Sequence, residues 1–143
     1  MPHLNNAYDD NDWWFKELRN RGGKFDMIAL SHYPQAQSKM TPAECNAAAI
    51  NRISSLNSTF GVKIMIAEVG VKTPLNESLA KSVLEEFVTS VKAMKACAGL
   101  FYWEPEVYGW WKPAVYNSLG WNAYDMGAFK SDGRPSSVMD CFK

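Results

Sequence analysis

The chain has 143 residues, the size of one ordinary domain or of a piece of a larger one. Its 47% apolar content is normal for a globular protein and argues against disorder. The 15 basic and 15 acidic residues balance to zero net charge without any basic block, which argues against nucleic acid or an anionic membrane as a partner.

Other simple signals are weak, with one exception. The three cysteines are isolated, so they suggest neither a zinc site nor a disulfide framework. The sequence shows no apolar run of membrane-spanning length and no leader peptide at its start. Aromatic residues are abundant at 13% and crowd into residues 101–124, which core packing alone does not explain.

The first predicted elements are a strand tip, a helix and a strand. The segment "MPHLNN" (1–6) is typical of the C-terminal tip of a strand. The segment "DWWFKELRNRGG" (12–23) predicts a helix whose Trp14 and Leu18 face inward and whose glycines end it. "FDMIALS" (25–31) then predicts a buried strand.

The next helix has a strong start signal at Thr41, which is followed by Pro42 at the first helical position and by Glu44 three residues after the cap. Gly61 marks its end. Its apolar residues recur at helical spacing: Ala49, Ile53, Leu56 and Phe60.

Two further strands flank a second long helix. "VKIMIAE" (62–68) and "GLFYW" (99–103) predict the strands, and a helix is predicted from about residue 77 to residue 97. The apolar stripe of that helix comprises Leu79, Val83, Phe87, Val91 and Met94. Strand centres recur about 36 residues apart, so the alternation predicts parallel strands with right-handed crossovers.

Two architectures fit this alternation, an open doubly wound sheet and a closed (β/α)8 barrel. No glycine-rich fingerprint follows any strand, which disfavours a nucleotide-binding sheet. A barrel with this spacing would need roughly 290 residues. The four visible units therefore predict half a barrel, a partial catalytic domain over residues 1–143 that lacks its other half.

Polar and aromatic side chains gather where the predicted strands end, which is where parallel barrels carry their chemistry. The tips supply His3 and Asn5, then Ser31, His32 and Tyr33, then Glu68, then Trp103 and Glu104. Strict alternation would put Glu68 on the same face as Ile64 and Ile66, and Trp103 on the same face as Phe101. We expect those faces to form the barrel interior.

A carboxylate beside aromatic rings fits sugar chemistry, because aromatic faces stack on sugar C–H surfaces. A retaining glycosidase needs two carboxyl groups about 5–5.5 Å apart, one as nucleophile and one as acid/base. Glu68 can be one of them. The second is not obvious, since Glu104 and Glu106 follow the last strand and Glu104 alternates away from Trp103.

The same segments resemble glycoside hydrolase family 53, the endo-β-1,4-galactanases that act on arabinogalactan. The resemblance covers nearly the whole chain. "HLNNAYDDNDWWFKELRNRGGKFDMIALSHYP" is similar to the family's fifth and sixth strands, "IMIAEVG" to its seventh and "GLFYWEPE" to its eighth, and "WNAYDMGAFKSDGRPSSVMDCF" is similar to its closing segment. The resemblance implies strands five to eight of a TIM barrel with flanking helices.

The resemblance also implies roles for particular residues. Glu68 would be the nucleophile of a retaining mechanism, and Trp103 a stacking platform for the sugar. Tyr33 or His32 would orient the nucleophile. The remaining expected substrate-binding residues are His3 and Asn5 on the glycone side, and Trp110 and Trp111, with Trp121, in the aromatic loop.

The family's acid/base residue lies at the end of its fourth strand, so it is expected to be absent from this chain. We therefore expect the isolated chain to be inactive on galactan, and either a homodimer or the missing N-terminal half to complete the barrel. The family implies no required cofactor, and it leaves calcium open because no ligand set matches here. It implies a secreted or periplasmic location and galactan as the partner.

Two alternative functions stay open from the sequence alone. The chain could be a galactan-binding remnant that has lost its chemistry, or a related retaining β-glycanase of the same clan, such as a mannanase or cellulase. The Trp-Glu-Pro segment at 103–105 favours galactan.

Overall fold

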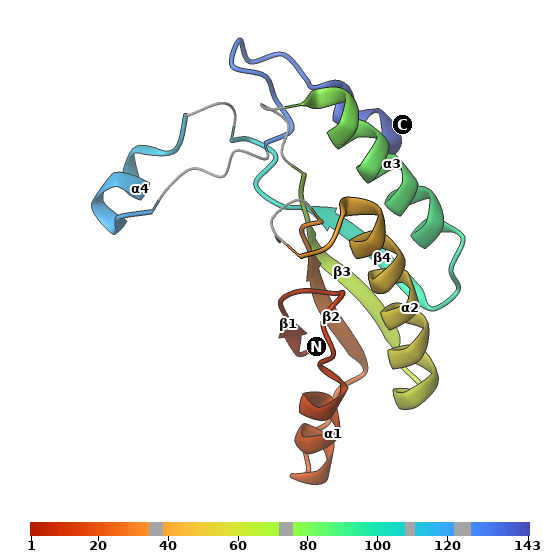
Figure 1. Ribbon diagram of the computed structural model, residues 1–143. Coiled ribbons are helices and arrows are strands. Elements are labelled where there is room, and N and C mark those ends of the chain that lie inside the picture. Colours follow the sequence, from red (N-terminus) through yellow and green to blue (C-terminus); the bar gives the residue numbers. More distant parts are fainter. Residues whose placement is uncertain (35–38, 72–75, 108–110, 122–126) are drawn as a thin grey trace.

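The computed structural model describes residues 1–34, 39–71, 76–107, 111–121 and 127–143 (Figure 1). Strands and helices alternate along the chain, as the sequence predicts. In order they are β1 (His3–Leu4), α1 (Asp12–Asn20), β2 (Met27–His32), α2 (Pro42–Phe60), β3 (Lys63–Val69), α3 (Glu77–Lys92), β4 (Cys97–Tyr102), α4 (Ala114–Leu119) and the 3-10 helix η1 (Ser137–Phe142).

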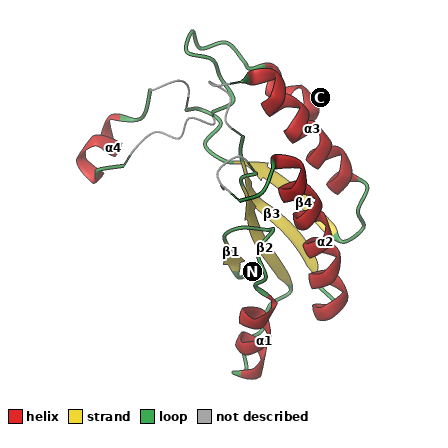
Figure 2. Cartoon of the chain, viewed as in Figure 1, coloured by secondary structure: helices red, strands yellow, loops and turns green. Residues whose placement is uncertain are grey.

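The four strands form one parallel sheet in the order β1-β2-β3-β4. The parallel direction brings all four carboxyl ends to one edge of the sheet. Helices α2 and α3 lie next to each other along one face of the sheet, whereas α4 stands apart from it (Figure 2). Within the described part of the chain, no helix covers the opposite face.

Helix α2 begins and ends as its sequence predicts. The Thr41 hydroxyl accepts a hydrogen bond from the Glu44 backbone N–H, and the Glu44 carboxylate accepts one from the Thr41 backbone N–H, which together form a capping box. Gly61 ends the helix with φ 68°, a left-handed conformation that glycine adopts without strain. The predicted inward stripe is confirmed: Ala49, Ile53, Leu56 and Phe60 are all buried.

Helices α1 and α3 differ from the predictions in detail. In α1 the fully buried residue is Phe15, while Trp14 and Leu18 are only partly buried against the core. Helix α3 ends at Lys92 rather than near Cys97, which instead begins β4. Leu79 in its first turn is exposed, because the buried stripe runs through neighbouring positions: Ala80, Val83, Leu84, Phe87, Val88 and Val91.

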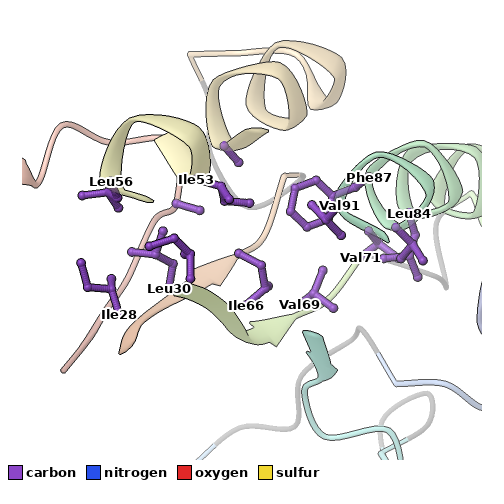
Figure 3. Packing of buried hydrophobic residues seen from close by; sticks show 14 of the residues in the cluster. Ile28, Leu30, Ile53, Leu56, Ile66, Val69, Val71, Leu84, Phe87 and Val91 are labelled. Carbon is purple, nitrogen blue, oxygen red and sulfur yellow. The ribbon is translucent and has the colours of Figure 1, made fainter. Parts of the chain in front are cut away.

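The core lies between the sheet and the two helices α2 and α3 (Figure 3). Strands β2 and β3 contribute Ile28, Leu30, Ile66 and Val69, and the helices contribute Ile53, Leu56, Leu84, Phe87 and Val91. The face that carries Ile64 and Ile66 is therefore the helix-covered face. The expectation that these isoleucines line the barrel interior is wrong, because their bulk is needed to fill the layer beneath the helices.

Candidate active site

Glu68 lies on the face of the sheet opposite to Ile66, although the two residues are an even number of positions apart. Leu30 of β2 pairs with Ile66 of β3, but the next residue, Ser31, pairs with Glu68, so β3 has one extra residue at this point. Such a β-bulge reverses the alternation of side chains beyond it. The bulge therefore turns Glu68 away from the core and returns Val69 to it.

Two hydroxyl groups hold the Glu68 carboxylate through the same oxygen. The Ser31 hydroxyl donates to Oε2 at 2.8 Å, and the Tyr33 hydroxyl donates to Oε2 at 2.9 Å. No described residue donates a hydrogen bond to the other oxygen, Oε1. Ser31 and Tyr33 are two positions apart at the end of β2, so both point to the same side of the sheet. This arrangement fixes Oε2 of the carboxylate on the open face of the sheet.

His3 reaches the same group of residues through Ser31. Its Nε2 lies 2.8 Å from the Ser31 hydroxyl oxygen. Strand β1, which carries His3, pairs with β2 through His3 and Ala29, and this register places the imidazole beside the end of β2. Three neighbouring strands thus contribute one polar cluster made of His3, Ser31, Tyr33 and Glu68, here called the Glu68 cluster.

His32 lies away from this cluster. It is fully buried on the helix-covered face, where its Nε2 lies 2.8 Å from the Asn46 side-chain oxygen and its ring packs on Phe87 with centroids 4.1 Å apart. Burial lowers the pKa of His32 to about 4, so the imidazole is neutral at pH 7. Of the two residues expected to orient Glu68, the structure brings Tyr33 to it and turns His32 to helix α2.

Trp103 lies beside the strand that carries Glu68. Its backbone N–H donates to the Val69 carbonyl oxygen at 2.9 Å, and its side chain is 37% exposed. On β4, Leu100 and Tyr102 pack against the core, whereas Phe101 between them is 61% exposed on the other side. An indole is thus available at the same edge of the sheet as Glu68.

The other expected binding residues are more scattered. Asn5 is exposed just after β1, and its side-chain oxygen accepts a hydrogen bond from the backbone N–H of Asn6 at 2.9 Å. Trp111 and Trp121 flank α4 and are exposed, and the Trp121 ring stacks edge-on against Tyr116. Trp110 lies outside the described residues. Within the described part of the chain, Asn5 and Trp121 make these contacts rather than one with Glu68.

Glu104 is the carboxylate that follows β4, and it is engaged elsewhere. Its Oε1 accepts a hydrogen bond from the Tyr116 hydroxyl at 2.7 Å, a contact that raises the pKa of Tyr116. Glu104 has φ 46°, an uncommon conformation for a residue with a side chain. This hydrogen bond joins α4 to the end of β4, so Glu104 helps to position the aromatic loop.

Ser31 is the member of the Glu68 cluster that was expected at a strand tip but had no role predicted from the sequence. Its signal was present, since alternation along β2 places Ser31 and Tyr33 on one side and His32 on the other. This pattern could not identify Ser31 as a partner of Glu68, because strict alternation along β3 placed Glu68 on the other face of the sheet. The bulge in β3 corrects that placement.

No group of three or more His, Cys, Asp or Glu side chains in the described residues could hold a metal ion. Likewise, none of the described helices is both long enough and apolar enough to cross a bilayer.

Comparison with known proteins gives consistent matches. The family model for glycosyl hydrolase family 53 matches residues 1–82. The arabinogalactan endo-beta-1,4-galactanases of Thermothelomyces thermophilus and Humicola insolens are 25% and 23% identical to this chain. These alignments include 100% and 99% of the chain but 47% and 46% of the relatives, so the chain spans about half their length.

A solved structure shares the fold. The GH53 catalytic domain from Ignisphaera aggregans superposes with a TM-score of 0.71 at 20% identity, over 99% of this chain and 45% of that one. Together with the four parallel strands and their helices, this match confirms the prediction of half a (β/α)8 barrel. The family model covers more than half of the chain and all four residues of the Glu68 cluster. The chain therefore belongs to glycosyl hydrolase family 53.

Proposed function

We propose that this chain supplies the nucleophile side of a retaining glycoside hydrolase that cleaves β-1,4-galactan in arabinogalactan and pectin side chains. The observation that carries the proposal is the convergence of the Ser31 and Tyr33 hydroxyl groups on one oxygen of Glu68. The names of the curated relatives support galactan rather than mannan or cellulose as the substrate.

Glu68 would react through Oε1. In the first step Oε1 forms a bond to the anomeric carbon, while the bond from that carbon to the leaving galactose oxygen breaks. A carboxylic acid about 5–5.5 Å away donates a proton to the leaving oxygen. In the second step water attacks the same carbon, the acid residue takes up the water proton as a base, and the Glu68 carboxylate is released. Ser31 and Tyr33 would keep Oε2 turned away from the sugar throughout.

The proton donor would come from an N-terminal half of the barrel, because a second copy of this chain would bring only the same carboxylates. Glu104, the carboxylate that follows β4, accepts a hydrogen bond from Tyr116, so we do not assign it this role. General acid catalysis typically contributes about 10²–10⁴-fold in rate. The chain by itself should therefore hydrolyse galactan at a trace level or not at all.

Two substrates with different leaving groups test whether the chain supplies the nucleophile but not the proton donor. Galactan needs a proton donor, whereas a dinitrophenyl β-galactobioside with fluorine beside the anomeric carbon releases a stable anion without one. We expect the purified chain to form a lasting covalent adduct with this activated fluorosugar, and the Glu68→Gln variant to form none. Rapid galactan hydrolysis by the chain alone would contradict the missing donor, and a folded chain that forms no adduct would contradict the nucleophile.

A non-catalytic galactan-binding function is the second candidate, favoured by the exposed indoles of Trp103, Trp111 and Trp121. Aromatic side chains that are exposed rather than packed in the core, when they lie together on a surface, often mark a binding site. Calorimetry with galactotetraose on the wild type and on Trp103→Ala tests it. Binding that is lost in Trp103→Ala, together with no adduct on Glu68, would favour this candidate.

The proposed chemistry requires no cofactor. Two carboxyl groups and water complete the reaction, so treatment with a chelator should leave adduct formation unchanged. A loss of labelling that calcium restores would contradict this.

Because galactan is a large extracellular polymer, we also propose a secreted or periplasmic location, which fractionation of the source cells would test.

A further inference from the structure

Two hydrogen bonds in series connect His3 to Glu68. The first joins His3 Nε2 to the Ser31 hydroxyl oxygen at 2.8 Å, and the second joins that hydroxyl to Glu68 Oε2 at 2.8 Å. The three residues come from β1, β2 and β3 in turn, so the series crosses the sheet at its carboxyl edge. Ser31 in the middle is only 3% exposed, which leaves little access for water to replace either partner.

The direction of these bonds follows from the number of hydrogens. A serine hydroxyl has a single hydrogen to donate, and an ionised carboxylate can only accept. Ser31 must therefore direct its hydrogen to Glu68, and its oxygen must accept a hydrogen from His3. The Nε2 atom of His3 consequently carries a hydrogen, and this hydrogen orients the serine.

We propose that His3 is a positioning residue that acts on Glu68 through Ser31, in addition to any contact with sugar. The inference deepens the proposed function and rests on it for its effect on rate. Without the hydrogen from His3, the Ser31 hydroxyl is free to turn toward the imidazole. Glu68 would then be held by Tyr33 alone, and its terminal torsion, which is intrinsically soft, would let the carboxylate rotate away from its reactive orientation.

Nuclear magnetic resonance tests the hydrogen-bond series without any activity. The chain has only two histidines, so labelling with ¹⁵N-histidine gives a simple spectrum. His32 serves as an internal reference, because the Asn46 amide donates to Val83 and Glu86 and its oxygen must accept from His32 Nε2–H. The His32 signal also reports whether each variant folds.

We expect the wild type to show an Nε2–H signal for His3 that is protected from exchange with water, although the side chain itself is exposed. Ser31→Ala should abolish this signal and keep that of His32, whereas Tyr33→Phe should keep both. A wild-type His3 without a protected signal, or a signal unchanged in Ser31→Ala, would overturn the proposal. Should Ser31→Ala not fold, the wild-type signal alone decides.

The labelling rate of Glu68 by the activated fluorosugar tests the effect on reactivity. Hydrogen bonds to charged groups suggest that His3→Leu and Ser31→Ala each slow labelling about tenfold. The double variant should be no slower than either single one, because both changes break the same series. His3→Gln should recover part of the loss, since its amide N–H can donate from a similar position.

The Tyr33 hydroxyl provides the matched control for the comparison of single and double variants. It reaches Oε2 without passing through Ser31, so His3→Leu combined with Tyr33→Phe should slow labelling further than either single change. A His3→Leu variant that is labelled at the wild-type rate, or full additivity with Ser31→Ala, would overturn the positioning role. If the wild type is not labelled at all, the proposed function fails, and the resonance experiment still decides the hydrogen-bond series.

Discussion

His32 and Glu68 sit near the ends of adjacent strands, yet the two faces of the sheet give them opposite environments. Glu68 meets two hydroxyl groups on the open face, whereas His32 meets the Phe87 ring and one amide under the helices. Within the described residues, Nδ1 of His32 is buried without a hydrogen-bond partner. A buried imidazole in this setting resists protonation, so it is a source of acid sensitivity.

The stability of the chain should therefore depend on pH through His32. The pKa of His32 is about 4 in the folded state against an ordinary value of 6.5, so the unfolded chain binds the proton first. This contribution is fully present above pH 6.5 and is lost as the pH falls toward 4, by up to about 3 kcal/mol. Urea unfolding of the wild type and of His32→Gln should show a difference that shrinks on acidification. A constant difference across this window would contradict the prediction.

At the scale of elements, the sequence predicted those features that depend on residues close together in the chain. The start of α2 followed from Thr41, Pro42 and Glu44, because a capping box depends on neighbours in sequence. The face of Glu68 could not be predicted, since the bulge at Ala67 is set by pairing between β2 and β3. The role of His32 was missed because its partner Asn46 lies in the next helix, α2, and the packing of that helix on the sheet sets their contact.

The capping box gives a direct test at this scale. Thr41→Ala removes the side chain that accepts from the Glu44 backbone N–H, which should lower the free energy of unfolding by about 1 kcal/mol. Ser58→Ala, on the exposed side of the same helix, should change it by less than about 0.5 kcal/mol. Denaturant unfolding measures both, and equal effects would show that the cap contributes nothing specific.

A second element contact joins the end of the chain to α3. Glu77 Oε1 accepts hydrogen bonds from the Ser137 backbone and side chain, both at 2.7 Å, and these bonds lower the pKa of Glu77 to about 2. Glu77→Gln should weaken the docking of η1 and speed its amide hydrogen exchange several-fold. Glu85→Gln, an exposed carboxylate on the same helix, is the control.

The pH dependence of this contact differs from that of His32. A depressed carboxylate pKa means that the stabilisation is present above pH 4.5 and disappears as the pH falls toward 2. Exchange of η1 in the wild type should therefore approach that of Glu77→Gln only at strongly acidic pH. Equal exchange of the two proteins at pH 7 would contradict the contact.

At the scale of the whole molecule, the sheet is open at both β1 and β4, and its inner face is uncovered in the described structure. Half a barrel was predictable from the strand spacing, because the repeat of a βα unit is recorded in the sequence itself. Open strand edges and an exposed apolar face favour association with another polypeptide. Phe101 lies on that face and is 61% exposed.

We therefore expect the isolated chain to self-associate through this face. Sedimentation velocity should show a dimer or larger species that Phe101→Lys shifts toward monomer. Leu79→Lys changes an exposed apolar residue on the helix side and should leave the association unchanged. A wild-type chain that sediments as a clean monomer would contradict this expectation.

The measurement that bears most directly on the central claim is the identity of the residue that carries the sugar after reaction with the activated fluorosugar. Peptide mapping by mass spectrometry should place one galactobiosyl group on Glu68, while galactan stays intact under the same conditions. An adduct on Glu104 or on any other carboxylate, or a folded chain without an adduct, would contradict Glu68 as the nucleophile.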